Sequence, residues 1–281
     1  MIGNIRIMGI LNLNEDSFYA ASRTKAGEVA VRAQKLFEEG ADVIDLGACS
    51  TRPGSTQPDV EEEWARLEPA LKELKIEGYS LPGGSVSLRS TISIDTFRAE
   101  IVQRVYDTIG PFLVNDISAG HLDPRMLETV GRLGLPFVAM HMRGTPENMQ
   151  QLTDYTDIVK DIEQYFREFA VQAQEAGIRE WILDPGFGFA KTIEQNYELM
   201  RRMGELKEAF PQEILVGVSR KSMAYKVLGI TPEEAMPATQ VLNFAALERG
   251  ATWLRVHDVA PAVQTAKLYS TMYTSSPGAA K

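Results

Sequence analysis

Three short apolar segments of the sequence each end in a polar side chain, namely Asp95, Asn115 and Asp184. Together these side chains offer carboxylate acceptors and an amide, a combination that suits a flat heterocycle rich in N–H groups. Each one alone could instead cap the following helix or bind a loop amide. If the three converge at one end of the molecule, recognition of such a ring is the better interpretation.

Cationic side chains follow two later apolar segments. Lys221 lies in "SRKS" (219–222), which opens a predicted helix, and Arg255 and His257 lie in "RVHD" (255–258). A guanidinium can hold an oxyanion through two parallel hydrogen bonds, and the imidazole can add another. Because the chain has a net charge of −9, a local gathering of cations predicts an anion-binding site. The alternative for the imidazole is a neutral histidine in the core.

The segment "STRPGS" (50–55) carries an arginine among hydroxyl groups and a rigid Pro-Gly pair. An ordinary surface turn can use Gly, Pro and Ser but has no need of Arg52. The two longest loops that follow a predicted strand are 14–27 and 47–58, and long loops at such positions are typically lids. We therefore predict that Arg52 helps to close one of these lids over a phosphorylated substrate. A further long stretch, 76–90, precedes a strand and is expected on the opposite face.

The segment "DPGFGFAKT" (184–192) has some features of a phosphate-binding P-loop but fails the pattern. A P-loop requires glycine where this chain has Pro185 and Ala190. The proline and the glycines instead predict a tight turn that presents Phe187 and Phe189. One of the two rings could flank an aromatic substrate, and ordinary core packing explains them equally well.

The sequence offers few metal ligands. Its three histidines, His121, His141 and His257, lack the spacing of a zinc site. A magnesium ion held partly by substrate phosphates and partly by an oxygen ligand such as Asn12 fits the composition better. Cys49 is the only cysteine, which excludes an intrachain disulfide and suits a reducing cytoplasm.

Eight short apolar segments supply the strands that must position these side chains. They span 5–11, 43–46, 92–94, 112–116, 137–141, 181–184, 214–219 and 253–258. Seven are almost wholly apolar, as expected of strands buried on both faces, whereas the last includes charged residues. Their average spacing of about 35 residues is that of repeated βα units. Helical periodicity and capping pairs fill the intervals, at 27–39, 155–176, Asp59–Glu62, Thr192–Gln195 and Thr231–Glu234.

This alternation predicts a single (β/α)8 barrel, a TIM barrel that spans residues 1–281, with an open doubly wound sheet as the rival. An open sheet gathers its chemistry at one switch point, whereas polar residues here end nearly every strand, as in a barrel. The composition is that of a soluble globular protein. It shows no basic stripe for nucleic acid, no secretory leader and no transmembrane segment. We expect a cytoplasmic protein without nucleic-acid or membrane partners.

Eight segments match a known family in sequence and in order: "MGILNLNEDSF", "GADVIDLGACSTRPGS", "ISIDTFRAE", "VNDISAG", "MHMRGTP", "ILDPGFGFAKT", "VGVSRKS" and "RVHD". On these segments the chain resembles the dihydropteroate synthases across nearly its whole length. The resemblance implies a pterin-binding barrel that condenses 6-hydroxymethyl-7,8-dihydropterin diphosphate with 4-aminobenzoate. The products would be 7,8-dihydropteroate and diphosphate, on the route to folate. The resemblance also implies Mg²⁺ bound with the diphosphate, a homodimer and a sulfonamide target.

The resemblance further implies roles for individual residues. The dihydropterin would lie against Asp95, Asn115, Met140, Asp184, Gly217 and Lys221. The diphosphate would be held by Asn12, Thr51, Arg52, Arg255 and His257, with Asn12 also a metal ligand. The 4-aminobenzoate would be surrounded by Thr51, Arg52, Pro53, Phe189, Lys221 and Ser222. The catalytic residues among these would be Asp95, Asp184, Lys221 and Arg52.

Breaking a carbon–oxygen bond to diphosphate leaves a cationic pterin-methylene, which a buried Asp95 can stabilise while lids exclude water. The chain departs from the family at three positions, where Glu15 replaces a proline, Cys49 a glutamate and Ala190 a common glycine. Two alternatives are a pterin-barrel methyltransferase that serves a corrinoid protein, and a non-catalytic relative that binds pterin or regulates a partner. The "STRPGS" and "SRKS" segments argue against the methyltransferase, and turnover would exclude the non-catalytic relative.

Overall fold

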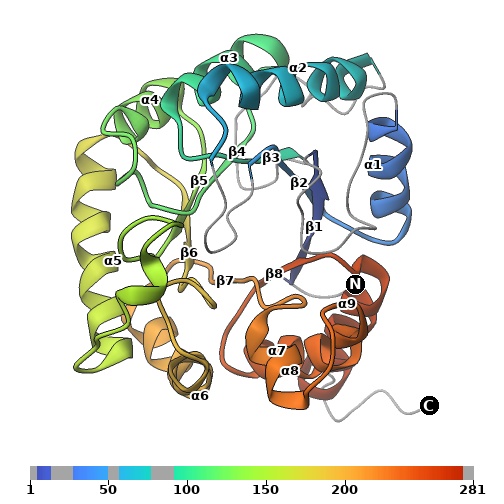
Figure 1. Cartoon of the computed structure of the whole chain (residues 1–281), viewed down its shortest axis with the longest axis vertical. Helices are drawn as coiled ribbons and strands as arrows, with labels where there is room; N and C mark the ends of the chain where they lie inside the picture. Colours follow the sequence, from blue (N-terminus) through green and yellow to red (C-terminus); the bar gives the residue numbers. More distant parts are fainter. Residues whose placement is uncertain (1–4, 14–27, 50–56, 77–91, 275–281) are drawn as a thin grey trace.

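A ring of parallel strands inside a ring of helices forms the frame of the protein (Figure 1). The computed structural model describes residues 5–13, 28–49, 57–76 and 92–274. In this part of the chain the strands are β1 (Arg6–Asn12), β2 (Val43–Gly47), β3 (Ile92–Asp95), β4 (Leu113–Asp116), β5 (Phe137–Met140), β6 (Trp181–Asp184), β7 (Leu215–Val216) and β8 (Trp253–Val256). Each corresponds to a predicted segment. β7 is shorter than the predicted 214–219 because a turn from Val218 to Lys221 follows it closely.

The order of the strands confirms a barrel and contradicts the open sheet. All neighbouring strands are parallel, in the order β6-β5-β4-β3-β2-β1-β8-β7. The two ends of this order meet, because Leu183 and Ile214 form a parallel bridge and the Leu183 amide donates to the Glu213 carbonyl at 3.0 Å. An open doubly wound sheet would reverse its strand order and leave two edges, and neither occurs among the described strands.

The helices cover the outside of the ring (Figure 1). In the described residues they are α1 (Val29–Glu38), α2 (Val60–Ile76), α3 (Ala99–Ile109), α4 (Met126–Leu133), α5 (Ile158–Glu175), α6 (Ile193–Ala209), α7 (Ser222–Leu228), α8 (Met236–Glu248) and α9 (Val259–Thr274), with short 3-10 turns η2 (Met149–Gln151) and η3 (Glu233–Ala235). The predicted helices at 27–39 and 155–176 are α1 and α5. No helix among the described residues combines the length and apolar character that a membrane crossing requires.

Two of the three predicted capping pairs form in full. Thr192 and Gln195 make a reciprocal capping box at the start of α6, and Asp59 and Glu62 exchange side-chain and backbone hydrogen bonds before α2. The third pair opens the 3-10 turn η3 rather than an α-helix. There the Glu234 carboxylate accepts the Thr231 amide at 2.9 Å. The helix start predicted from this capping pair is therefore wrong by one turn, since α8 begins only at Met236.

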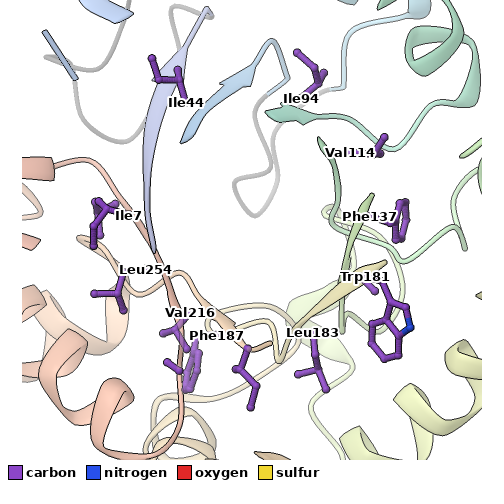
Figure 2. Packing of buried hydrophobic residues seen from close by; sticks show 14 of the residues in the cluster. Ile7, Ile44, Ile94, Val114, Phe137, Trp181, Leu183, Phe187, Val216 and Leu254 are labelled. Atoms are coloured by element: carbon purple, nitrogen blue, oxygen red, sulfur yellow. The ribbon is translucent and has the colours of Figure 1, made fainter. Parts of the chain in front are cut away.

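Side-chain alternation along the strands separates two apolar layers. Residues such as Ile44, Val114 and Leu254 point outward and pack against the helices (Figure 2). The alternate set forms a second, separate cluster inside the ring: Met8, Val43, Leu113, Val138, Ile182, Leu215 and Trp253. We call this second cluster the plug. Because it fills the barrel interior with side chains of 0% exposure, any site must lie beyond it, toward the carboxyl ends of the strands.

Candidate active site

The positions two residues beyond the plug form the floor of the candidate site. Since alternate residues of a strand share a face, these positions point into the barrel above the plug. On β3, where Ser93 stands at the plug level in register with Leu113, the position is Asp95. Leaving out the apolar Ile10 on β1, we call these positions the inner ring: Asp45, Asp95, Asn115, Met140, Asp184, Gly217 and Arg255. The structure therefore brings together the strand residues that were predicted to bind the pterin, and it adds Asp45 to them.

Arg255 bridges two carboxylates of the inner ring. Its Nε donates to Oδ2 of Asp45 at 2.7 Å, and its Nη2 donates to Oδ2 of Asp95 at 2.7 Å. Nδ2 of Asn115 donates to the same Asp45 oxygen at 3.0 Å. Sequence reasoning missed Asp45 because it considered only polar residues at strand ends. The segment "VIDL" contains the signal, because Asp45 is a carboxylate inside an otherwise apolar strand. It lies two residues after Val43 and therefore on the same inward-facing side of β2.

Burial within the inner ring raises the pKa of two of its carboxylates, Asp95 and Asp184. Burial raises the pKa of Asp95 to about 7, and the Arg255 guanidinium only partly offsets this because Asp45, a second carboxylate, shares it. Burial also raises the pKa of Asp184, against the opposing effects of Lys221 and of the Gly186 amide, which donates to Asp184 Oδ1 at 2.8 Å. Buried carboxylates with raised pKa values are typical of functional sites.

Lys221 reaches the inner ring from the loop after β7. Its ammonium donates to the Phe187 carbonyl at 2.7 Å and lies 4.6 Å from the centre of the Phe189 ring. Burial lowers the pKa of Lys221 to about 8, with Asp184 opposing the shift. A Cβ added to Gly217 would lie 3.9 Å from both Lys221 Nζ and Arg255 Cβ, so the side chains of both cationic residues border this glycine.

The structure separates the two phenylalanines that the sequence left undecided. Phe187 is fully buried in the core that packs against the helices. Phe189 instead belongs to a third cluster, which contains Met140, Ile117 and Ala190 and lies on the side of the site. Phe189 is therefore the ring that can flank a substrate, whereas Phe187 is a packing residue.

A buried lysine that the sequence reasoning passed over supports the Phe189 loop. The Lys191 ammonium donates to the carbonyls of Gly186 and Phe189 at 2.9 and 3.0 Å and lies 3.0 Å from Nδ1 of His141. Burial lowers the pKa of Lys191 well below its usual value. The same loop explains the family preference for glycine at position 190, because Ala190 adopts a left-handed φ of 50°.

The loops after β7 and β8 carry Arg220 and His257 and form another side of the site. Nδ1 of His257 lies 3.0 Å from Oγ of Ser219. The two loops are joined by an ion pair between Arg220 and Asp258, in which Nε and Nη2 contact the two carboxylate oxygens at 2.8 Å each. This pair was not singled out from the sequence. It fixes the residue before Lys221 and the residue after His257. Ser222, the first residue of α7, follows Lys221 directly.

Asn12 ends β1 on the inward parity, in register with Gly47. A Cβ at Gly47 would lie 3.4 Å from Oδ1 of Asn12 and 3.7 Å from Oδ2 of Asp95, so this amide oxygen and this carboxylate flank one glycine. No group of three or more His, Cys, Asp or Glu side chains within the described ranges could hold a metal ion by itself. The residues present therefore fit an ion held largely by substrate oxygens and water, with Asn12 as a protein ligand.

Cys49 lies at the described start of the "STRPGS" loop. Its sulfur is 3.5 Å from Nη1 of Arg98, which is also paired with the fully buried Glu63, while Nη2 of Arg98 donates to the Pro58 carbonyl. A carboxylate from α2 therefore lies close to Cys49 and contacts the same guanidinium. Burial raises the pKa of the Cys49 thiol. Thr51, Arg52, Pro53, Glu15 and the stretch 77–91 lie outside the described residues.

Comparisons with known proteins agree with this geometry. The family described as pterin-binding enzyme matches residues 8–257. Dihydropteroate synthase of Synechocystis sp. is 38% identical over 272 residues, covering 95% of this chain and 90% of the relative. Folic acid synthesis protein fol1 of Pneumocystis carinii is 41% identical over 90% of this chain, which spans only 34% of that protein.

A solved structure agrees over a similar extent. The crystal structure of Yersinia pestis dihydropteroate synthase with a sulfonamide drug complex superposes with a TM-score of 0.87 at 31% identity. It covers 98% of this chain and 96% of the other. This chain therefore belongs to the pterin-binding enzyme family and, within it, to the dihydropteroate synthases.

Proposed function

We propose that this chain condenses 6-hydroxymethyl-7,8-dihydropterin diphosphate with 4-aminobenzoate to give 7,8-dihydropteroate and diphosphate. The observation that carries the proposal is the gathering of two carboxylates and two cationic side chains at the carboxyl end of the barrel strands. Asp95 is bound to Arg255, Asp184 interacts electrostatically with Lys221, and Gly217 separates the two cations. Carboxylates suit the N–H-rich pterin and its developing cation, and cations suit the departing anion.

In this reaction the bond from the pterin methylene carbon to the diphosphate oxygen breaks, and its electron pair leaves with the diphosphate. The ionised Asp95 carboxylate stabilises the positive charge that remains on the pterin-methylene group, and Asp184 and Asn115 hold the ring. The amine of 4-aminobenzoate then forms the carbon–nitrogen bond and afterwards loses one proton. No strong base is needed, because this amine is already nucleophilic.

The leaving diphosphate requires positive charge at the other side of the site. Arg255 and His257 supply it from β8 and the loop that follows. Mg²⁺ bound by Asn12 and the diphosphate would neutralise further negative charge on the leaving group. We assign Thr51 and Arg52 to the same anion on the basis of the family resemblance, with Arg52 also ordering the 4-aminobenzoate pocket.

The 4-aminobenzoate would lie against Phe189, Lys221 and Ser222, with Thr51 and Pro53 completing its pocket. The support for this assignment is the position of Phe189, which lies beneath the Lys221 ammonium on the site-facing cluster rather than in the core.

We further infer a cytoplasmic homodimer. Exposed apolar side chains on the last two helices, Val241, Leu268 and Met272, favour such an association surface.

A coupled assay of diphosphate release tests the proposed function. We expect release that requires the dihydropterin diphosphate, 4-aminobenzoate and Mg²⁺ together, and release no faster than background would overturn the proposal in favour of a non-catalytic pterin-binding protein. We also expect Arg52→Ala to cripple turnover while pterin affinity stays largely intact. Methyl transfer to a corrinoid protein in place of diphosphate release would identify the methyltransferase alternative.

A further inference from the structure

Asp45 is the carboxylate of the inner ring that the proposed reaction leaves without a role. Its side chain has 0% exposure, whereas those of Asp95 and Arg255 are 12% and 20% exposed. A ligand that enters the barrel can therefore reach Asp95 and Arg255 but not Asp45. Any influence of Asp45 on the reaction must act through the residues that it contacts.

The contacts of Asp45 use one edge of the Arg255 guanidinium. Nε and Nη2, which form the side-on edge, each lie 2.7 Å from Oδ2 of Asp45. The second hydrogen of Nη2 is directed to Oδ2 of Asp95 at 2.7 Å. Because Nε and both hydrogens of Nη2 are engaged by the two carboxylates, Nη1 is the nitrogen of Arg255 that a ligand can meet.

The same Asp45 oxygen also orients the pterin side of the inner ring. Oδ2 accepts the Asn115 Nδ2 at 3.0 Å, so one oxygen on β2 joins side chains from β4 and β8. Oδ1 of Asp45 makes no hydrogen bond within the described part of the chain. The hydrogen bonding of this carboxylate is thus concentrated on a single atom that serves both halves of the site.

We propose that Asp45 is a positioning residue that fixes the Arg255 guanidinium and the Asn115 amide, so that Arg255 presents its Nη1 hydrogens to the diphosphate. This inference rests on the proposed function for the identity of the anion. Without Asp45, the guanidinium keeps a single hydrogen bond to Asp95 and turns toward that carboxylate. Nη1 is then no longer held in a fixed direction toward the leaving group.

Three substitutions of Asp45 distinguish the effect of its acceptor oxygen from the effect of its negative charge. Asp45→Asn keeps an oxygen for Arg255 and Asn115, whereas Asp45→Ala removes it, and Asp45→Leu removes it while filling the space should the alanine variant fail to fold. Ser93→Ala is the matched control. Ser93 is a fully buried polar neighbour in register with Asp45, and its hydroxyl makes no hydrogen bond among the described residues.

The first readout is the ¹H–¹⁵N resonance of Arg255 Nε in the substrate-free protein, assigned by its loss in Arg255→Lys. We expect its proton to exchange about 10-fold faster or more in Asp45→Ala and to remain protected in Asp45→Asn. The second readout is calorimetric binding of inorganic diphosphate, for which we expect Kd to rise about 10-fold or more in Asp45→Ala and about 3-fold or less in Asp45→Asn. KM for 4-aminobenzoate should change about 2-fold or less in either variant, a split that general misfolding would not produce.

An Asp45→Ala protein that matches Ser93→Ala in Nε exchange and in diphosphate affinity would overturn the inference. A parallel rise of both Michaelis constants in Asp45→Asn would do the same, since it would indicate a general structural role. Absence of turnover in the unmodified protein would defeat the proposed function alone, because the Nε resonance still reports whether Asp45 fixes Arg255.

Discussion

Burial is the main reason that the pKa of Asp95 is raised, and the Arg255 guanidinium, which Asp95 shares with Asp45, opposes this only in part. The carboxylates of Asp45 on β2, Glu63 on α2 and Asp116 on β4 raise the pKa of Asp95 further. Lys221 is shifted in the opposite direction, because burial disfavours its charged form. Two of the four residues assigned to catalysis, Asp95 and Lys221, therefore have pKa values of about 7 and about 8.

A pH profile checks this pair. We expect kcat/KM for the dihydropterin diphosphate to fall as the pH drops through about 7, because protonated Asp95 cannot stabilise a cation. We expect it to fall again as the pH rises through about 8, because Lys221 loses its charge. A profile that stays flat between about pH 5 and about pH 10 would contradict both assignments.

Gly217 tests the size of the slot between the two cations. In Gly217→Ala the new methyl group would meet Arg255 and Lys221 at ordinary contact distances, so the fold should accommodate it. We expect KM for the dihydropterin diphosphate to rise about 10-fold, since a methyl group in a binding pocket has an effect of this order. Gly204→Ala on α6, where a Cβ meets nothing within 4 Å, is the control and should leave KM unchanged.

At the scale of elements, the segments that carry the site are tied down by buried polar contacts outside it. Arg98 at the start of α3 joins Glu63 on α2, the Cys49 sulfur after β2 and the Pro58 carbonyl before α2. Both described ends of the loop that carries Arg52 thus contact one side chain. Lys191 and Arg220 play the same part for the loops after β6 and β7.

Removing Arg98 should destabilise the fold, because the Glu63 side chain has no exposed surface and its charge could not be hydrated. We expect Arg98→Met to lower the free energy of unfolding by about 3–5 kcal/mol in urea titrations, and Arg98→Met with Glu63→Leu to recover much of this loss. Arg125→Ala, whose side chain is 66% exposed beside Asp123, is the control and should change stability by about 0.5 kcal/mol or less. Equal losses in the single and double variants would refute a buried ion pair.

At the scale of the molecule, closure of the barrel makes the site possible. β7 has two residues, Leu215 and Val216, and the junction with β6 is a single bridge, yet the plug is continuous across it through Ile182 and Leu215. Packing inside the ring therefore compensates for sparse hydrogen bonding at the seam. The plug also keeps the barrel dry below the inner ring, which strengthens the electrostatic interactions of the carboxylates.

Leu215→Ala probes this seam. We expect the free energy of unfolding to fall by about 2–5 kcal/mol, the cost of a cavity in a packed core, with one cooperative transition by both fluorescence and circular dichroism. Val171→Ala on α5, at a side chain that is 56% exposed, should change it by about 0.5 kcal/mol or less. Two separate transitions would indicate that the seam unfolds independently of the rest of the barrel.

The sequence by itself determined the strand positions, the barrel and most of the inner ring. Hydrophobic periodicity and composition are local properties, and a buried parallel strand shows them as a nearly continuous apolar segment. Asp95, Asn115 and Asp184 could be identified because each ends a strand. The resemblance to a family then supplied their roles, which local patterns do not contain.

The tertiary structure alone decided how these residues are paired. Asp45 meets Arg255 across 210 positions of the chain, and no local pattern predicts which of several carboxylates a given arginine will contact. Burial likewise separated Phe187 in the core from Phe189 at the site, although the two rings lie two residues apart in the same turn. Partner choice and proton affinity depend on distances through space and on exclusion of water, and both exist only once the barrel has closed.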